Sequence, residues 1–186
     1  MLRGIDVSHH NKLIQLSGID FVIMKATEGR SYVDPKMLAW YKQCKKDNVR
    51  LKGFYHFARP ENNNPKAEAN HFIKTVKDYI DGTTLVALDW EGHALYQSLD
   101  WALTWLNEVE EALRITPLFY CQSSYTPLIR RIYENGNGLW VAHYTGANKP
   151  IIGAYPFWTM WQYTSRAYDK NYFNGDANQY IKYCRS

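Results

Sequence analysis

Two carboxylates placed two positions apart are the most informative feature of this 186-residue chain. Apolar residues lead up to Asp89, as in a buried strand, and Glu91 follows. Side chains at positions i and i+2 of an extended chain share a face, so both carboxylates can reach one site. Such a pair suits glycoside hydrolysis, which needs one protonated carboxyl group and one ionised carboxylate. Acids at a strand end also make salt bridges and helix caps, so the pair alone does not decide between the two roles.

Two more acids lie at the ends of other strand-like segments. Asp6 ends the first such segment, and Asp169 follows the last one. Taken alone, Asp169 is typical of a turn residue. Because inward-facing residues at the carboxyl ends of barrel strands line one site, we expect four acids from three distant segments to converge there. Close like charges raise the pKa of one member, which keeps that carboxyl group protonated near neutral pH.

Polar and aromatic side chains close several predicted strands and are candidates for substrate binding. Lys25 and Glu28 end the second strand and could bind substrate or neutralise the neighbouring acids. Aromatic rings and an amide beside acids suit sugar recognition, although roughly half of the late-strand residues are expected in the core. The complete set of expected substrate-binding residues is Tyr55, Lys25, Glu28, Tyr120, Trp140, Tyr144, Trp161 and Gln162.

Two alternatives to a carboxylate-based hydrolase remain open. His9 and His10 lie near Asp6, and a metal-dependent hydrolase could use Asp6, His9 and Asp89. The sequence contains no His-x-His or His-Glu-x-x-His spacing, so we expect no metal ion and no cofactor. His56, near the end of the third predicted strand, is expected to be structural. The second alternative is a sugar-binding module whose acids are no longer catalytic.

The elements that position these residues alternate between strand-like and helix-like patterns. Helices are expected to start at Asp34-Pro35 and Asn64-Pro65, where a capping residue precedes proline. Residues 98–114 carry an apolar helical face, and a shorter helix is expected over residues 125–133. The predicted strands span residues 2–7, 21–27, 51–57, 85–91, 118–122, 139–144 and 158–163.

This alternation predicts parallel strands joined by right-handed crossovers. After Gly138 the link between the last two predicted strands is rich in glycine and proline and shows no helical pattern, so we expect the C-terminal third of the chain to contain strand and loop only. A full (β/α)₈ barrel needs ~250 residues, which is more than this chain has. We therefore expect an α/β fold in one domain, residues 1–186, forming an irregular TIM-like barrel of about eight strands whose last helices are missing.

The composition indicates an ordinary globular chain, with 46% hydrophobic and 22% charged residues. No apolar run approaches the ~18 residues of a membrane span. The net charge of +4 is scattered, so neither membrane nor nucleic-acid binding is expected. The three cysteines are expected to be buried thiols. A strand pattern begins directly after Met1 and leaves no room for a signal peptide, so we expect a protein made in the cytosol or a trimmed secreted protein. We also expect the protein to be a monomer.

These residues in these positions resemble the glycoside hydrolase family 25 lysozymes, the Chalaropsis-type muramidases of fungi, bacteria and phages. The matching blocks follow the family order over nearly the whole chain: residues 4–8, 20–29, 53–57, 88–91, 139–144, 161–164 and 169–173. Residues 12–16 depart from the family pattern, because the usual glycine and the tryptophan of the first helix are absent. That departure bears on the packing of the first helix and not on the acids.

The resemblance implies an eight-stranded irregular barrel that hydrolyses, with retention, the β-1,4 bond between N-acetylmuramic acid and N-acetylglucosamine. By position, Glu91 matches the general acid and base, and the acids that complete the site are Asp89, Asp6 and Asp169. One reading makes an aspartate the nucleophile, and the other lets the substrate's acetamido group attack while Asp89 orients it. The implied substrate is peptidoglycan in the bacterial cell wall, reached by a phage lysis enzyme through holin lesions or by a secreted protein.

Overall fold

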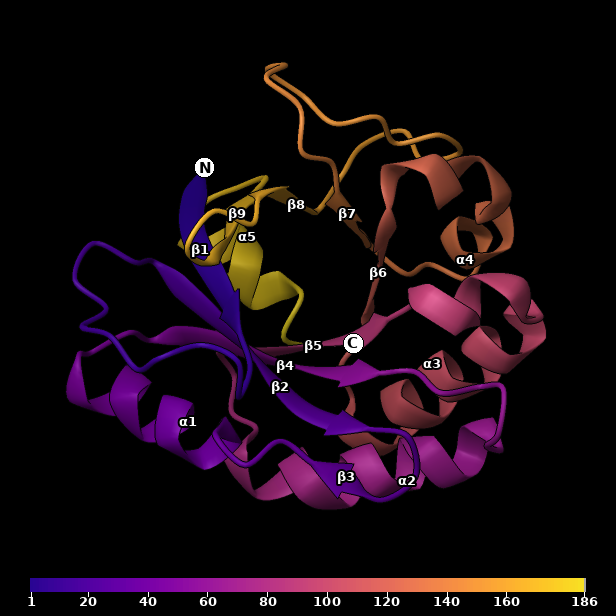
Figure 1. Ribbon diagram of the computed structural model, residues 1–186, viewed down its shortest axis with the longest axis horizontal. Helices are drawn as coiled ribbons and strands as arrows, with labels where there is room; N and C mark the ends of the chain where they lie inside the picture. The colour runs from indigo at the N-terminus through magenta and orange to yellow at the C-terminus, as the bar shows by residue number, and fades with distance from the viewer. Residues whose placement is uncertain (186) are drawn as a thin grey trace.

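The strands of the computed structural model form a closed barrel with helices around it (Figure 1). The structure describes residues 1–185, and Ser186, the last residue of the predicted domain, lies outside the described residues. The order around the barrel is β1-β9-β8-β7-β6-β5-β4-β2, and pairing of β1 with β2 closes the ring. The strands are β1 (Leu2–Val7), β2 (Phe21–Glu28), β3 (Tyr32–Val33), β4 (Leu51–Phe57), β5 (Thr84–Asp89), β6 (Leu118–Gln122), β7 (Leu139–Ala142), β8 (Met160–Thr164) and β9 (Asp169–Phe173). Apart from β3, a short partner of β2, these strands make the predicted eight-stranded α/β barrel.

The last strand, β9, differs from what the sequence predicts. Asp169 is not a turn residue, because it is the first residue of β9. β9 runs antiparallel to both β8 and β1, whereas the other neighbouring barrel strands are parallel. An antiparallel neighbour can follow a short turn, so residues 165–168 suffice to join β8 to β9. The register of β9 on β1 places Asp169 directly opposite Asp6.

Five α-helices lie in the described residues, and α1 to α4 cover the outside of the ring (Figure 1). Two predicted helix starts are confirmed, since the Asn64 side chain caps α2 and the Ser98 side chain caps α3. Each caps by accepting a hydrogen bond from a free backbone N–H of the first turn. The helices are α1 (Met37–Lys46), α2 (Pro65–Val76), α3 (Leu99–Leu113), α4 (Arg130–Glu134) and α5 (Ala177–Lys182).

Two of the predicted helices need correction. α1 begins at Met37 and not after Asp34, whose buried carboxylate accepts hydrogen bonds from the backbone of Lys36 through Oδ1 and from the backbone and ring of His9 through Oδ2. The helix predicted over residues 125–133 is divided into a 3₁₀ segment, Ser123–Leu128, and α4. Pro127 lies at this division, and proline lacks the N–H that a continuous α-helix would use.

The prediction of strand and loop alone after residue 138 is also wrong, because α5 follows β9. Asp176 caps this six-residue helix in a capping box. Tyr180 of α5 is fully buried, and its ring lies 5.5 Å from that of Phe21 and 5.0 Å from that of Phe173. Its hydroxyl group donates a 2.9 Å hydrogen bond to the Lys52 carbonyl oxygen. These contacts close the end of the barrel at which the parallel strands begin.

Several strands are shorter than predicted, and the difference matters most at β5. β5 ends at Asp89, so Glu91 lies beyond it. The backbone of Glu91 is still extended, with φ −144° and ψ 179°, so the alternation of side chains continues from Asp89. Gly92 then takes φ +59°, a left-handed conformation that favours glycine, and turns the chain into a 3₁₀ helix. Tyr144 and Trp158 likewise fall outside β7 and β8.

Apolar side chains form two layers, because alternate strand residues point into and out of the barrel. The inner layer includes Phe21, Ile23, Leu85, Leu118, Met160 and Phe173. The outer layer lies between the strands and the helices and includes Val22, Met24, Trp40, Phe72, Trp105 and Val109. All three cysteines are free and buried, as predicted. Among residues 1–185, no helix combines the length and the apolar character that crossing a membrane requires.

Candidate active site

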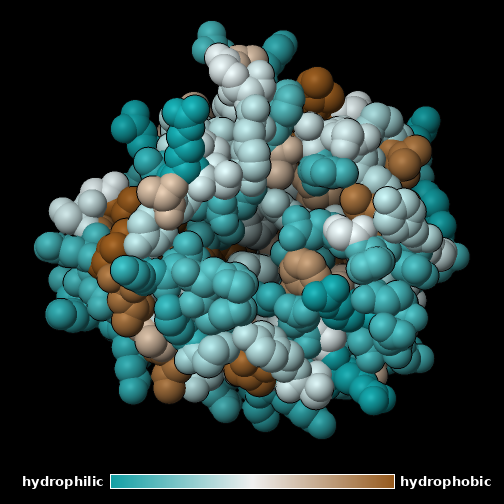
Figure 2. Space-filling view, viewed as in Figure 1, coloured by the Kyte–Doolittle hydropathy of each residue, from teal (hydrophilic) through white to brown (hydrophobic). Residues whose placement is uncertain are grey.

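The structure brings the four predicted acids together in one cavity of about 180 Å³. Asp6 and Asp89 lie near the carboxyl ends of the parallel strands β1 and β5, and Asp169 begins the antiparallel β9 at the same end of the barrel. Figure 2 shows a hollow inside the ring of strands, surrounded mainly by hydrophilic residues. The residues that line the cavity are Asp6, Tyr55, Asp89, Glu91, Tyr120, Trp140, Tyr144, Gln162 and Asp169.

Two amide side chains fix the carboxylate of Asp6. Its Oδ2 accepts a 2.8 Å hydrogen bond from Gln162 Nε2 and a 2.7 Å hydrogen bond from Asn171 Nδ2. The Oδ1 of Asn171 in turn accepts a 2.8 Å hydrogen bond from Trp140 Nε1. Asp6, Gln162 and Asn171 are all at least nine-tenths buried, so these hydrogen bonds hold the Asp6 carboxylate between the two amides.

Burial and mutual repulsion favour the protonated forms of the acids. Burial, followed by the charge of Asp169, raises the pKa of Asp6 from 3.8 to about 8, even though its two amide donors favour the ionised form. Burial also raises the pKa of Asp169. Four carboxyl groups in one small cavity therefore do not all ionise together, and the site retains protons near neutral pH.

The pKa values of Asp89 and Glu91 are also raised. Burial, followed by the charge of Glu91, raises the pKa of Asp89 well above its ordinary value, while Lys25 lowers it. Burial also raises the pKa of Glu91, against the opposing positive charge of Lys25. The carboxyl group of Asp89 lines the cavity, and its Oδ1 is buried and has no hydrogen-bond partner within residues 1–185.

Hydroxyl and amide groups line the wall opposite these acids. The Oε1 of Gln162 accepts hydrogen bonds from the hydroxyl groups of Tyr120, at 3.0 Å, and of Tyr144. Burial raises the pKa of Tyr144 to about 12, so its hydroxyl group stays neutral over the working pH range. The ring of Trp140 packs 4.8 Å from that of Tyr120 and 6.2 Å from that of Tyr55. Polar groups on rigid aromatic rings suit the recognition of a sugar.

Three expected substrate-binding residues do not line this cavity. Lys25 is buried inside the barrel, and its Nζ donates a 2.6 Å hydrogen bond to Glu28. Trp161 lies on the opposite face of β8 from Gln162, and its Nε1 donates a hydrogen bond to the His143 carbonyl oxygen. Trp161 therefore lines a different cavity, of about 320 Å³, on the outside of the barrel.

The metal-dependent alternative needs His9 beside the acids, and the structure places it elsewhere. His9 Nδ1 lies 2.8 Å from the buried Asp34 Oδ2, and His9 is not among the residues that line the cavity. Asn171 and Arg59, in contrast, contact site residues although the sequence did not single them out. For Asn171 a signal was present, because it lies two positions after Asp169 and shares its face in an extended strand.

In comparison with known protein families, residues 5–172 match the family described as "Glycosyl hydrolases family 25". Lysozyme M1 of Streptomyces globisporus is 30% identical over 95% of this chain and 69% of its own length. The N,O-diacetylmuramidase of Chalaropsis sp is 28% identical over 97% of this chain and 98% of its own length. The crystal structure of the bacterial lysozyme from Streptomyces coelicolor superposes with a TM-score of 0.86 at 28% identity, covering 98% of this chain and 96% of that one.

Proposed function

The chain belongs to glycosyl hydrolases family 25, because the family match spans residues 5–172, and on this premise we propose that it is a muramidase that cleaves peptidoglycan. The bond is the β-1,4 link from N-acetylmuramic acid to N-acetylglucosamine. The related enzymes named a lysozyme and an N,O-diacetylmuramidase support this assignment. The observation that carries the site assignment is the convergence of four carboxyl groups with tyrosine and amide side chains in one cavity.

Glu91 is the general acid and base of the proposed reaction. A general acid needs a pKa near the operating pH, and burial raises that of Glu91 toward this range. Its carboxyl group protonates the glycosidic oxygen as the bond breaks, and the resulting carboxylate then removes a proton from the attacking water. The extended backbone at Glu91 directs its side chain to the same side as that of Asp89.

Asp89 acts on the other side of the reacting sugar. We favour substrate assistance, in which the acetamido group attacks the anomeric carbon and Asp89 accepts a hydrogen bond from its N–H. The position of Asp89 supports this role, because its carboxyl group lines the same cavity as that of Glu91. In the competing mechanism an aspartate attacks directly, and a covalent glycosyl adduct on a site aspartate would then be detectable by mass spectrometry.

Asp6 and Asp169 complete the acidic site, and their negative charges contribute to its electrostatic potential. Asp6 also orients Gln162 and, through it, the hydroxyl groups of Tyr120 and Tyr144. We assign the catalytic domain to residues 1–186 and its substrate to glycan strands of the cell wall, on which it acts as a monomer. The proposed mechanism uses protein side chains and the substrate alone, without a metal ion or cofactor.

Mass spectrometry of digested peptidoglycan tests the proposed bond. Purified wall is digested, the products are reduced, and the sugar at the new reducing end is identified. We expect N-acetylmuramic acid there. N-acetylglucosamine at that end would make the protein a glucosaminidase, and free stem peptides would make it an amidase.

The same preparation separates the two competing functions. A sugar-binding module would sediment with peptidoglycan but release no fragments at any pH. A metal-dependent hydrolase would lose activity with a chelator and regain it with zinc. We expect fragments to be released at an undiminished rate in the presence of the chelator.

A further inference from the structure

Lys25 brings a positive charge to the acidic cavity from inside the barrel. Its side chain is only 9% exposed, and Lys25 pairs in register with Tyr55, which lines the cavity. The charge of Lys25 lowers the pKa of both Asp89 and Glu91. A flexible ammonium group has this effect only if something holds it in place, and the contacts around Lys25 show what does.

A β-bulge brings Lys25 and Glu28 to one side of the strand. Residues three positions apart on a regular strand point to opposite faces. The pairing of β2 with β4 shifts between Lys25 and Thr27, which inserts Ala26 as an extra residue. As a result Lys25 Nζ donates a 2.6 Å hydrogen bond to Glu28 Oε2, while Thr27 faces the outer layer and meets His56.

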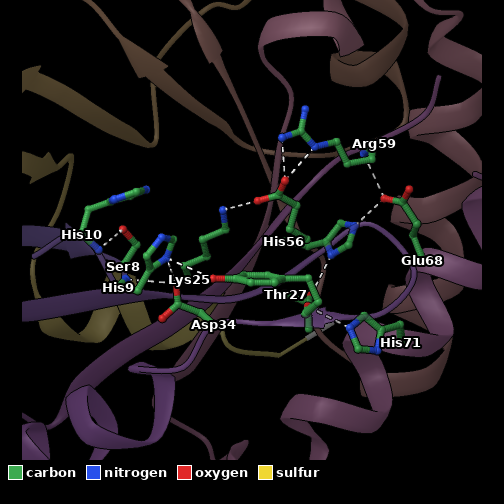
Figure 3. Close-up of polar contacts among 12 residues, drawn as sticks. Ser8, His9, His10, Lys25, Thr27, Asp34, His56, Arg59, Glu68 and His71 are labelled. Atoms are coloured by element: carbon green, nitrogen blue, oxygen red, sulfur yellow. Dashed lines mark hydrogen bonds and ion pairs between the residues drawn. The ribbon is translucent and has the colours of Figure 1, made fainter. Parts of the chain in front are cut away.

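Arg59 holds the other oxygen of the same carboxylate. Its Nε lies 2.7 Å and its Nη2 lies 2.6 Å from Glu28 Oε1. Figure 3 shows Lys25 and Arg59 pointing toward this carboxylate from two sides. Both cations also contact the ring of Phe57, whose centroid lies 4.7 Å from Lys25 Nζ and 4.7 Å from Arg59 Cζ. The ammonium group is thus fixed by one ion pair and by two aromatic rings, those of Phe57 and, at 5.8 Å, Tyr32.

The backbone of Arg59 is itself anchored in the buried outer layer. Its N–H donates a 3.1 Å hydrogen bond to Glu68 Oε2, which also lies 2.7 Å from His56 Nε2. The other ring nitrogen of His56 lies 2.7 Å from Thr27 Oγ1, on the bulged part of β2. Glu68, His56 and Thr27 are fully buried. One rigid network therefore fixes both ends of the Lys25–Glu28–Arg59 chain.

We propose that Glu28 and Arg59 are positioning residues: they hold the Lys25 ammonium group beside Asp89 and Glu91, where its charge sets the pH range in which one carboxyl group is ionised and the other carries the catalytic proton. This inference rests on the proposed function, in which Asp89 and Glu91 are the catalytic pair. Neither Glu28 nor Arg59 needs to touch the substrate for this role.

The direction in which the pH profile shifts distinguishes a positioning role of Glu28 from a direct effect of its own charge. Charged groups face the catalytic pair from β1, β2, the segment after β4, and β9: Asp6, Lys25, Glu28, Arg59 and Asp169. The negative charge of Glu28 raises the pKa of Asp89. Removing that charge alone would therefore move the acidic limb of the pH profile to lower pH. If Glu28 acts by holding Lys25, its removal releases the ammonium group and moves the limb to higher pH.

The test is the pH dependence of kcat/KM on soluble glycan fragments for Lys25→Met, Glu28→Gln and Arg59→Lys. We expect Lys25→Met to move both limbs to higher pH by about half a unit or more, because a nearby cation lowers carboxyl pKa values. Glu28→Gln should move the acidic limb in the same direction. Arg59→Lys keeps the charge but loses the two-pronged contact, and should move the limb part of the way.

Two results would overturn the inference. One is an acidic limb that moves to lower pH, or does not move, in Glu28→Gln. The other is an unchanged profile in Arg59→Lys, whose half-exposed site tolerates the substitution without unfolding the protein. Arg130→Gln, which breaks an exposed ion pair with Glu134 on α4, is the matched control and should leave the profile unchanged.

A parallel measurement on Glu91→Gln keeps this test separate from the proposed function. If Glu91→Gln keeps its activity, the assignment of the catalytic pair fails. If Glu91→Gln is inactive and the positioning variants keep the wild-type profile, only the positioning role fails. Thermal melting of each variant confirms that the compared proteins are folded.

Discussion

The side chain of Asn171 on β9 holds the carboxylate of Asp6 on the neighbouring strand β1, because its Nδ2 donates a 2.7 Å hydrogen bond to Asp6 Oδ2. The two residues are 165 positions apart in the chain. Asn171 is fully buried and also accepts a hydrogen bond from Trp140 Nε1. One amide group thus provides a hydrogen-bond partner for both a carboxylate and an indole N–H, which have few other partners inside the barrel.

We expect Asn171→Ala to lower the free energy of unfolding by about 2–3 kcal/mol, because it leaves a buried indole N–H unpaired and opens a small cavity. For a chain of this size that corresponds to a fall in Tm of roughly 5–10 °C. Asn174→Ala is the control, since Asn174 Nδ2 donates an exposed hydrogen bond to the Trp158 carbonyl oxygen. Equal losses in the two variants, measured by thermal melting, would contradict a special role for Asn171.

Asp6→Asn should make the protein more stable at pH 8 and no more stable at pH 4. Burial raises the pKa of Asp6 from 3.8 to about 8 in the folded state. The folded state therefore binds more protons than the unfolded state between these values, and the wild type loses stability as the pH rises from about 4 to 8. An asparagine keeps an oxygen for the Gln162 and Asn171 donors without acquiring charge.

We expect the gain in Asp6→Asn at pH 8 to be about 1–2 kcal/mol, or roughly 3–8 °C in Tm. Melting curves at intervals between pH 4 and 8 measure it, and Asp78→Asn provides an exposed control on the surface. Parallel pH dependences for Asp6→Asn and the wild type would show that Asp6 ionises in the folded state as it does in water. The expected gain in stability comes with a loss of activity, as is common for charged residues in active sites.

The strands that the sequence predicts with correct bounds are those with uninterrupted patterns. β1, β4 and β6 have the predicted ends because their alternate residues enter one of the two apolar layers. β9 was missed because two of its three inward residues are polar: Asp169 lines the acidic cavity and Asn171 binds Asp6, so only Phe173 enters the apolar inner layer. The polarity that makes this strand functional also hides it from a search for apolar alternation.

The convergence of the acids was predictable because barrel geometry brings strand ends to one rim. The contacts that position Lys25 were not, because they depend on the bulge at Ala26, which the sequence does not mark. Arg59 was missed for the same reason, since only the folded chain places its side chain on Glu28. α5 could have been found, because Asp176 and Gln179 have the spacing of a capping box.

Glu91→Gln should lower kcat by about 10²- to 10⁴-fold while the protein remains folded, because it removes the proton donor and little volume. Binding of peptidoglycan should be retained, since the tyrosine and amide groups of the cavity are unchanged. The release of reducing ends from purified wall measures the rate, and sedimentation with wall measures the binding. A variant that kept more than about a tenth of the wild-type rate would show that Glu91 is not the general acid.

Asp169→Asn should move the alkaline limb of the kcat/KM profile to lower pH. The negative charge of Asp169 raises the pKa of Glu91, which must stay protonated to act as the acid. Without that charge Glu91 loses its proton at lower pH, so activity near neutral pH falls, with an expected shift of about half to one unit. Asp78→Asn removes one exposed negative charge from the same protein and should leave the profile unchanged. The charge of Asp169 raises the pKa of Glu91. An alkaline limb that stayed in place or moved to higher pH in Asp169→Asn would therefore mean that another carboxyl group holds the catalytic proton.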